Sequence, residues 1–256
     1  MSWDPQQYDK FEAPRWRPAL DLLNALPSDL TPRRVVELGC GGGKLSRLLA
    51  DRFAQAEVTG IDGSADMLTQ AAAKPSRVRW VEADMAGWQP EESVDLIISN
   101  AALHWLPNHA DLFKHLIGAL TPGGVLAVQM PRNFAAASHA IPRDIAGDPR
   151  WADRLAGSLV AVVPVHEPAA YYDWLAPRTT GLDIWETEYL QVLDGENAVL
   201  EWLKGTTLRP VMAALSEAEL ADFMAAAAPR LAQVYPRRAD GHTLFPFRRL
   251  FLIARK

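Results

Sequence analysis

The stretch Val35-Val36-Glu37-Leu38-Gly39-Cys40-Gly41-Gly42-Gly43 decides the fold of this chain. Its apolar, β-branched beginning is typical of a short buried strand, and a helical pattern over residues 44–53 follows, with Leu45, Leu48 and Leu49 on one face. Glycines between a strand and a helix can adopt positive φ and let the backbone approach a ligand closely. The stretch therefore predicts a strand, a ligand-binding turn and a helix.

The same alternation of strands and helices continues to about residue 131. We expect strands over 58–62, 78–82, 95–99 and 125–130, and helices over 65–74 and 111–120. Ser64 is a natural N-cap for the first of these helices. The strand at 95–99 is almost fully apolar, as in strands buried on both faces. This pattern predicts an α/β fold with a doubly wound, mostly parallel sheet.

The second half of the chain follows a different pattern. Residues 133–177 are rich in alanine, proline and aromatic residues and predict loops and short helices. We expect a strand over 182–193, helices over 198–203 and 216–234, and a final strand over 250–254; Ser216 and Glu219 form a capping-box pair. About fifty residues separate the last two strands, too many for a hairpin loop. They predict a helical insert covering the ligand site.

Other glycine-rich loops fit this sequence less well. A dinucleotide fingerprint counted from Gly39 needs a glycine at position 44, which is Lys44. A phosphate-binding P-loop needs serine or threonine after Gly43-Lys44, and Leu45 stands there. No tyrosine has a lysine four residues further on, as short-chain reductases require. A nicotinamide oxidoreductase is therefore disfavoured.

Polar residues stand at the ends of the predicted strands. Asp62 lies about twenty residues beyond the glycines, where a carboxylate can accept both hydroxyls of a ribose. The Asp84 carboxylate can accept a hydrogen bond from an adenine amino group, with Met85 packing on the ring, although a solvated loop aspartate fits equally well. Asn100 ends the fourth strand, and Trp105 either walls the site or belongs to the core.

In this order and spacing, these features resemble the class I S-adenosylmethionine-dependent methyltransferases over about residues 30–131. The resemblance implies a Rossmann-like, doubly wound, seven-stranded sheet whose last strand, supplied by residues 250–254, is antiparallel. It implies S-adenosyl-L-methionine as the cofactor. The residues themselves predict no metal, because the sequence has no cluster of cysteines and histidines. The residues expected at the cofactor are Tyr8, Gly39, Cys40, Gly41, Asp62, Gly63, Met67, Asp84, Met85, Asn100 and Trp105.

A narrower resemblance, to the trans-aconitate methyltransferases, extends over nearly the whole chain. It rests on stretches such as Trp3-Asp4-Pro5, 35–41, 60–62, 125–131, 171–173 and 208–210. It implies methylation of a carboxylate of trans-aconitate, giving the monomethyl ester and S-adenosylhomocysteine. Two positions depart from the family pattern, because proline is common where Gly42 stands and glutamine where His104 stands.

The residues expected at the tricarboxylate are Arg209, Arg132, Arg249, His104 and Tyr172. Arg209 is the first choice, because a guanidinium matches a carboxylate with two hydrogen bonds. We expect one domain over 1–256, in which 1–30 forms an N-terminal cap over the cofactor and 31–131 binds it. Residues 132–180 and 195–246 are expected to cover the substrate. Trp3, Tyr8, Tyr171 and Trp202 either enclose the site or serve as packing.

Composition narrows the class of protein. The net charge of −5 argues against a nucleic-acid partner. One cysteine, Cys40, allows no disulfide within the chain and no cysteine-based zinc site. Residues 1–10 lack the apolar stretch of a signal peptide, and no 18-residue apolar run predicts a membrane span. We therefore expect a soluble cytoplasmic protein of undetermined oligomeric state.

A carboxylate acceptor is already ionised at neutral pH and needs no general base, so no acid or base residue is expected. The enzyme's task would be orientation and exclusion of water. Two alternatives stay open: a methyltransferase acting on oxygen or carbon of another small molecule, and a non-catalytic protein that binds the cofactor.

Overall fold

The computed structural model describes residues 12–157, 159 and 165–256 of the 256-residue chain. The chain divides into two compact units. The sheet unit consists of Arg17–Pro131, Val163–Thr187 and Arg249–Lys256, and the helical unit of Met1–Trp16, Arg132–Val162 and Glu188–Arg248. Each unit is described below by itself.

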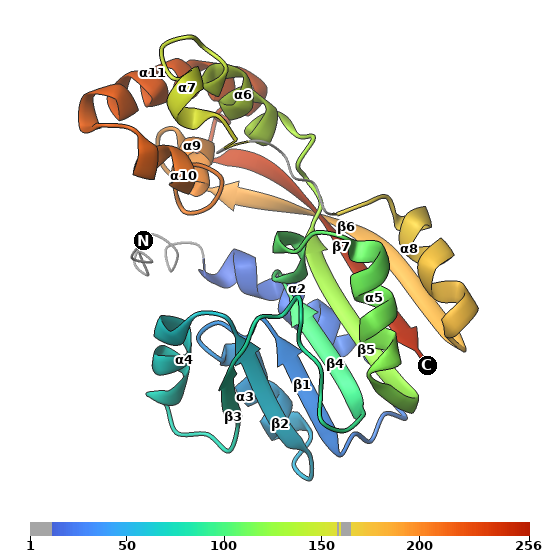
Figure 1. The fold of residues 1–256 in the computed structure, drawn as a ribbon. Helices are drawn as coiled ribbons and strands as arrows, with labels where there is room; N and C mark the ends of the chain where they lie inside the picture. The colour runs from blue at the N-terminus through green and yellow to red at the C-terminus, as the bar shows by residue number, and fades with distance from the viewer. Residues whose placement is uncertain (1–11, 158, 160–164) are drawn as a thin grey trace. The chain divides into compact units, whose positions relative to one another are not determined.

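The strands form one seven-stranded sheet with the order β3-β2-β1-β4-β5-β7-β6 (Figure 1). The strands are β1 (Arg34–Leu38), β2 (Glu57–Asp62), β3 (Arg79–Glu82), β4 (Val94–Asn100), β5 (Leu120–Pro131), β6 (Gly181–Leu193) and β7 (Thr243–Arg255). Strands β1 to β5 pair in parallel, whereas β7 is antiparallel to β5. The predicted doubly wound sheet with an antiparallel last strand is confirmed.

The last strand is longer than the sequence predicted. The prediction covered 250–254, whereas β7 begins at Thr243. The additional residues alternate between buried and partly exposed side chains, and Phe245 and Phe247 join the core of the helical unit. The prediction stopped at the continuous apolar run and missed the alternating half, because Arg248 and Arg249 interrupt the apolar pattern.

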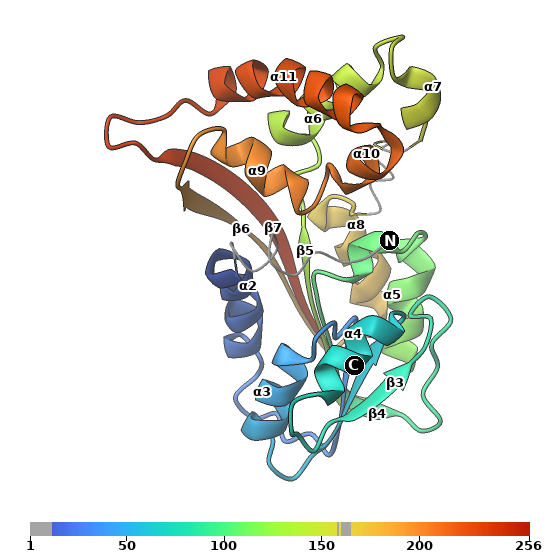
Figure 2. The same ribbon diagram turned by 90° about the vertical axis from the view of Figure 1, so that its left-hand side faces the viewer.

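Helices cover both faces of the sheet in the sheet unit. They are α2 (Glu12–Asn24), α3 (Lys44–Arg52), α4 (Ala65–Ala72), η1 (Leu103–Trp105), α5 (His109–Gly118), α8 (Pro168–Leu175) and η2 (Ala176–Arg178). Helices α2 and α3 lie on one side of the sheet and α5 and α8 on the other (Figure 2). Tyr171 of α8 is buried, and its hydroxyl lies 2.7 Å from His109 Nδ1 of α5, so this tyrosine serves as packing.

Two predicted helix starts are confirmed. Met67 N donates to Ser64 Oγ at 3.4 Å, which makes Ser64 the N-cap of α4. The Ser216 hydroxyl and the Glu219 side chain form a capping box at the start of α11 (Glu217–Val234). The helix predicted over 111–120 instead runs from His109 to Gly118, because Leu120 pairs with Val94 and opens β5.

The helical unit has an apolar core of its own. Its helices are α6 (Ala137–Ala146), α7 (Ala152–Leu155), α9 (Ala198–Lys204), α10 (Arg209–Ala214) and α11 (Glu217–Val234). Trp202 and Phe223 are fully buried in this core together with Phe245 from β7. Trp202 therefore belongs to the packing of the helical unit. Across the described residues, no helix has the length and apolar character needed to cross a membrane.

Candidate active site at the carboxyl ends of the strands

The loop between β1 and α3 needs glycine at three of its four glycine positions. Gly39, Gly41 and Gly43 have φ values of 77°, 50° and 71°, in the left-handed region that glycine adopts without strain. A Cβ at Gly39 would overlap the Cβ of Ala102. A Cβ at Gly42 would meet nothing within 4 Å. The backbone therefore has room for a side chain at position 42.

Asp62, at the end of β2, holds this loop in place. Its Oδ2 accepts a hydrogen bond from Gly41 N at 2.8 Å, and its Oδ1 accepts one from Ser64 N at 2.9 Å. A carboxylate offers about four lone-pair sites, so both oxygens can accept further hydrogen bonds. The side chain is half-buried. Asp62 thus orders the glycine loop and still presents acceptors to a ligand.

Two methionines flank the loop. The Met67 Cε lies 3.7 Å from a Cβ built at Gly41, and the Met85 Sδ lies 3.2 Å from one built at Gly39. Asp84, directly before Met85, is exposed, and its Oδ1 accepts from Ala86 N at 3.0 Å. The structure therefore brings Gly39, Gly41, Asp62, Met67 and Met85 together. The adjacent Gly63 is exposed.

Glu37 is a buried residue of this region that the sequence analysis did not select. It lies in β1, and Ser46 Oγ of α3 donates to its Oε2. The pKa of Glu37 is raised to about 8, chiefly by burial and to a lesser extent by the Asp62 charge, while the hydrogen bond from Ser46 opposes the rise. A charged residue inside a buried strand just before the glycines was the available signal. Burial also raises the pKa of the Cys40 thiol, so Cys40 is not an activated nucleophile.

Strand register places further polar side chains on one face of the sheet. Asn100 of β4 pairs with Gln129 of β5, and Pro131 of β5 pairs with Arg249 of β7. Paired residues point to the same face, as do residues two apart in one strand. Asn100, Gln129 and Arg249 therefore share a face at the carboxyl ends of β4 and β5. In open α/β sheets, ligands bind outside these carboxyl ends.

Two of the predicted residues lie in η1, just after β4. His104 is 9% exposed, and its pKa is lowered to about 3, first by burial and then by the positive charge of Arg249. Trp105 is 75% exposed, so it is not a core residue. Its ring centroid lies 4.6 Å from that of His104. The site is thus bordered by a neutral, buried imidazole and an exposed indole.

Known proteins resemble this chain along its whole length. A family model described as a methyltransferase domain matches residues 35–124. The trans-aconitate 2-methyltransferase of Azoarcus sp. (strain BH72) is 47% identical over 99% of this chain and 98% of its own length. That of Rhodopseudomonas palustris (strain BisB18) is 46% identical over 99% of both chains. The chain belongs to the trans-aconitate 2-methyltransferase family.

Solved structures confirm the fold of this family member. The YcgJ protein of Bacillus subtilis covers 94% of this chain and 98% of its own, with a TM-score of 0.60 and 13% identity. A phosphoethanolamine N-methyltransferase of Haemonchus contortus, solved with S-adenosylhomocysteine, covers 94% of this chain and 52% of its own. Its TM-score is 0.56 and its identity 17%. Such low identities establish the shared fold alone.

Two of the arginines expected at the substrate lie in the helical unit. Arg132 follows β5, and its N–H donates to Arg248 O at 2.9 Å. Arg209 begins α10 and is half-buried. Close to it in sequence, Thr207 Oγ1 lies 3.1 Å from His139 Nε2. Both side-chain amide atoms of the buried Asn133 lack a hydrogen-bond partner among the described residues. These polar groups make the helical unit a candidate for substrate contacts.

The remaining predicted residues are less informative. Tyr172 is 58% exposed on α8, and no hydrogen bond or ring contact joins it to the other site residues that the structure describes. Tyr8 lies outside the described residues.

Within the described parts of the chain, no group of histidine, cysteine and acidic residues has the geometry of a metal site.

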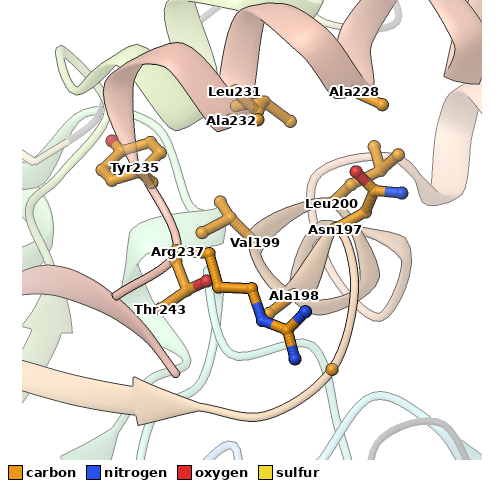
Figure 3. A pocket seen from close by; sticks show the side chains of 11 residues that line it. Asn197, Ala198, Val199, Leu200, Ala228, Leu231, Ala232, Tyr235, Arg237 and Thr243 are labelled. Carbon is orange, nitrogen blue, oxygen red and sulfur yellow. The ribbon is translucent and has the colours of Figure 1, made fainter. Parts of the chain in front are cut away.

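The helical unit also contains a cavity of about 60 Å³ (Figure 3). Tyr235, Arg237 and Thr243 border it, and the rest of its lining comes mainly from apolar residues of α9 and α11. Its volume corresponds to a few water molecules at most. This cavity is too small for a nucleoside, and we do not assign it to the active site.

Proposed function

We propose that this protein transfers the methyl group of S-adenosyl-L-methionine to a carboxylate of trans-aconitate. The products are the monomethyl ester and S-adenosylhomocysteine. The observation that carries the proposal is the 46–47% identity to relatives named for this reaction, which covers 99% of the chain. The aligned region contains the helical unit as well as the glycine loop. It therefore contains both the residues that we assign to the cofactor and those that we assign to the substrate.

The residues around the glycine loop fit the proposed cofactor. The backbone is open at Gly42, and the oxygens of Asp62 can accept the hydroxyls of a ribose. Asp84 and Met85 are assigned to the adenine. Further cofactor contacts are assigned to Tyr8, Gly39, Cys40, Gly41, Gly63, Met67, Asn100 and Trp105. When bound, the cofactor supplies an electrophilic methyl group on a positively charged sulfur.

The side chains of the site favour a carboxylate acceptor. Carboxylic acids of this kind have pKa values near 4, so the acceptor is ionised at neutral pH without a base. The lowered pKa of His104 keeps its imidazole neutral, and the raised pKa of Cys40 keeps its thiol protonated. Negative acceptor and positive sulfur neutralise each other as the methyl group is transferred, so excluding water favours the reaction. The protein's contribution is positioning and enclosure.

Arginines are the proposed partners of the substrate's other carboxylates. We assign this role to Arg249, Arg209 and Arg132, with His104 and Tyr172 completing the pocket. Of these, Arg249 has the strongest support in the sheet unit, since its buried side chain lies on the face that carries Asn100. We further propose that 1–256 functions as one methyltransferase domain. In it, 1–30 covers the cofactor, 31–131 binds it, and 132–180 with 195–246 covers the substrate.

The composition of the chain supports a small-molecule substrate and a cytoplasmic location. The net charge of −5 and the single cysteine favour a small-molecule methyltransferase of the cytoplasm over a protein that binds nucleic acid or is secreted. Both expectations rest on sequence composition.

A transfer assay tests the proposal directly. The purified protein is incubated with methyl-labelled S-adenosylmethionine and, separately, with trans-aconitate, cis-aconitate, citrate and isocitrate. We expect a base-labile labelled ester with trans-aconitate at the highest kcat/KM. Label on a hydroxyl or carbon of another compound would favour a different small-molecule methyltransferase. Cofactor binding without transfer to any acid would favour a non-catalytic binding protein.

A further inference from the structure

Gln129 and Arg249 are joined by a hydrogen bond across strands β5 and β7. Arg249 Nη1 donates to Gln129 Oε1 at 3.3 Å. Both side chains are buried, with exposed fractions of 0% for Gln129 and 5% for Arg249. A guanidinium can only donate hydrogen bonds, so the oxygen of the amide must face Arg249. The orientation of the Gln129 amide is thereby fixed.

This orientation leaves the NH₂ group of Gln129 pointing away from Arg249. Its Nε2 has no hydrogen-bond acceptor among the described residues. Buried polar groups in native proteins are nearly always paired, and an unpaired one calls for an explanation such as a ligand. Two N–H donors beside a guanidinium require an acceptor, and a carboxylate is an acceptor that both groups bind well.

Asn100 and Gln129 are neighbours in the sheet, but they suit different ligands. The residues are paired in register, and Asn100 Oδ1 is also buried without a donor among the described residues. Asn100 therefore offers an acceptor, and Gln129 offers donors. Asn100 lies on the side of β1 and its glycine loop, whereas Gln129 lies next to β7 and Arg249. A donor-bearing cofactor suits the first position, and an anionic substrate suits the second.

We propose that the Gln129 NH₂ group and the Arg249 guanidinium together bind one carboxylate of the substrate, a carboxylate that is not methylated. The inference rests on the proposed function for its substrate class. It assigns Gln129 as a specificity-determining residue, which selects acids with a carboxylate at this position.

Two variants of Gln129 test the roles of its NH₂ donor and its oxygen acceptor separately. Gln129→Glu keeps an oxygen for Arg249, removes the NH₂ donors and adds a negative charge. Gln129→Met has a similar length and lacks both groups. The matched control is Gln191→Met, which changes a buried glutamine of β6 that has no assigned role.

Binding is measured by calorimetry with trans-aconitate and protein saturated with S-adenosylhomocysteine. We expect at least tenfold weaker binding of trans-aconitate in Gln129→Met and a larger loss in Gln129→Glu, where the new charge repels the acid. The affinity for S-adenosylhomocysteine should change less than twofold in both variants, which also shows that they fold. Gln191→Met should behave as wild type.

Dicarboxylates that lack one carboxylate each identify the group that is bound. Itaconate, glutaconate and mesaconate each omit a different carboxylate of trans-aconitate. For one of them, wild type and Gln129→Met should bind equally, because the partner of Gln129 is already missing. For the other two, the variant should show the same loss as with trans-aconitate.

The outcomes distinguish this inference from the proposed function. Unchanged trans-aconitate binding in both variants would overturn the inference, even if wild type methylates the acid. An equal loss with all three dicarboxylates would also overturn it, because the effect would then be a general distortion. The expected binding pattern without any methyl transfer would support the carboxylate site and refute the proposed reaction. Wild type that binds none of these acids would refute both.

Discussion

The backbone N–H of Gly41 donates to Oδ2 of Asp62 at 2.8 Å, across a separation of 21 residues in the sequence. The bond ties the glycine loop after β1 to the end of β2. The other carboxylate oxygen accepts from Ser64 N at 2.9 Å, at the N-cap of α4. One side chain therefore fixes the loop and the start of the next helix, in addition to its proposed role at the ribose.

Removal of the Asp62 carboxylate should weaken cofactor binding strongly. Hydrogen bonds to charged groups contribute about 1.5–3 kcal/mol each, so Asp62→Ala should raise the dissociation constant by roughly tenfold to several hundredfold. Asp62→Asn retains an acceptor and should show a smaller loss. The protein should still fold, because Asp62 is half-buried at a strand end. Calorimetry with S-adenosylhomocysteine checks this prediction, and wild-type affinity in Asp62→Ala would refute the ribose assignment.

Alanine should have opposite effects at two glycines of the same loop. Gly39→Ala would force a Cβ into Ala102 at a φ of 77° and should destabilise the protein by about 2 kcal/mol or more. Gly42→Ala places its methyl group in open space and should be neutral or stabilise by up to about 1 kcal/mol through the unfolded state. Urea unfolding of both variants provides the measurement. Equal destabilisation would show that Gly42 is conformationally restricted as well.

Local sequence patterns predict the parts of the site that lie on consecutive strands and helices of the first half of the chain. The glycine loop, the Ser64 cap and Asp62 follow from residue types at fixed spacing along alternating strands and helices. Gln129 was not predicted, because a single glutamine inside an apolar strand carries no local signal of its partner. That partner, Arg249, is 120 residues away in the sequence. Strand order and register bring the two together, and neither follows from local pattern.

Glu37 was missed for a related reason. Its hydrogen bond with Ser46 depends on how α3 packs on the sheet, which spacing alone does not specify. For Tyr171 and Trp202 the sequence allowed two roles, enclosure of the site or packing. Their burial shows that both are packing residues. Burial depends on the tertiary environment, and aromatic residues suit a core and a ligand site equally well.

Arg209 remains a proposed carboxylate partner in the helical unit. Truncation of one partner in a buried charge pair costs about 2–5 kcal/mol. Arg209→Ala should therefore raise the activation free energy that corresponds to kcat/KM for trans-aconitate by about 2–5 kcal/mol. Arg209→Lys should recover part of the loss, since the two-pronged geometry of the guanidinium is absent. Arg238→Ala, which removes an exposed arginine of the same unit, is the control. Normal kinetics in Arg209→Ala with unchanged cofactor affinity would mark Arg209 as a surface residue.

Glu37 should make the protein less stable as pH rises toward 8. Its pKa is raised from 4.5 in the unfolded chain to about 8 in the folded protein, chiefly by burial. Between these values the unfolded state has released the proton and the folded state retains it, so the free energy of unfolding falls with increasing pH. Glu37→Gln should remove this contribution and have a higher Tm than wild type at pH 8. Thermal melts from pH 5 to 8 test this, with Glu196→Gln as the exposed control; parallel curves for wild type and Glu37→Gln would contradict it.

His104 provides the test that separates a carboxylate acceptor from a hydroxyl or acidic carbon. The pKa of His104 is lowered to about 3, first by burial and then by the charge of Arg249, so the imidazole stays neutral from pH 5 to 8. With a carboxylate acceptor, kcat should rise only as the substrate ionises and then stay flat through pH 6.5. His104→Gln should change kcat less than about tenfold, because no proton transfer is lost.

A hydroxyl acceptor would give a different and equally specific result. A hydroxyl acceptor must lose its proton to a positioned base, and such a base contributes about 10²–10⁴-fold. A titration of kcat near neutral pH in wild type that disappears in His104→Gln, with a loss above about a hundredfold, would therefore identify His104 as that base. His242→Gln, which changes a partly exposed histidine of the helical unit, controls for general effects of the substitution. Since neutral imidazole can accept a proton, the size of the loss and not the charge state of His104 decides between the two acceptors.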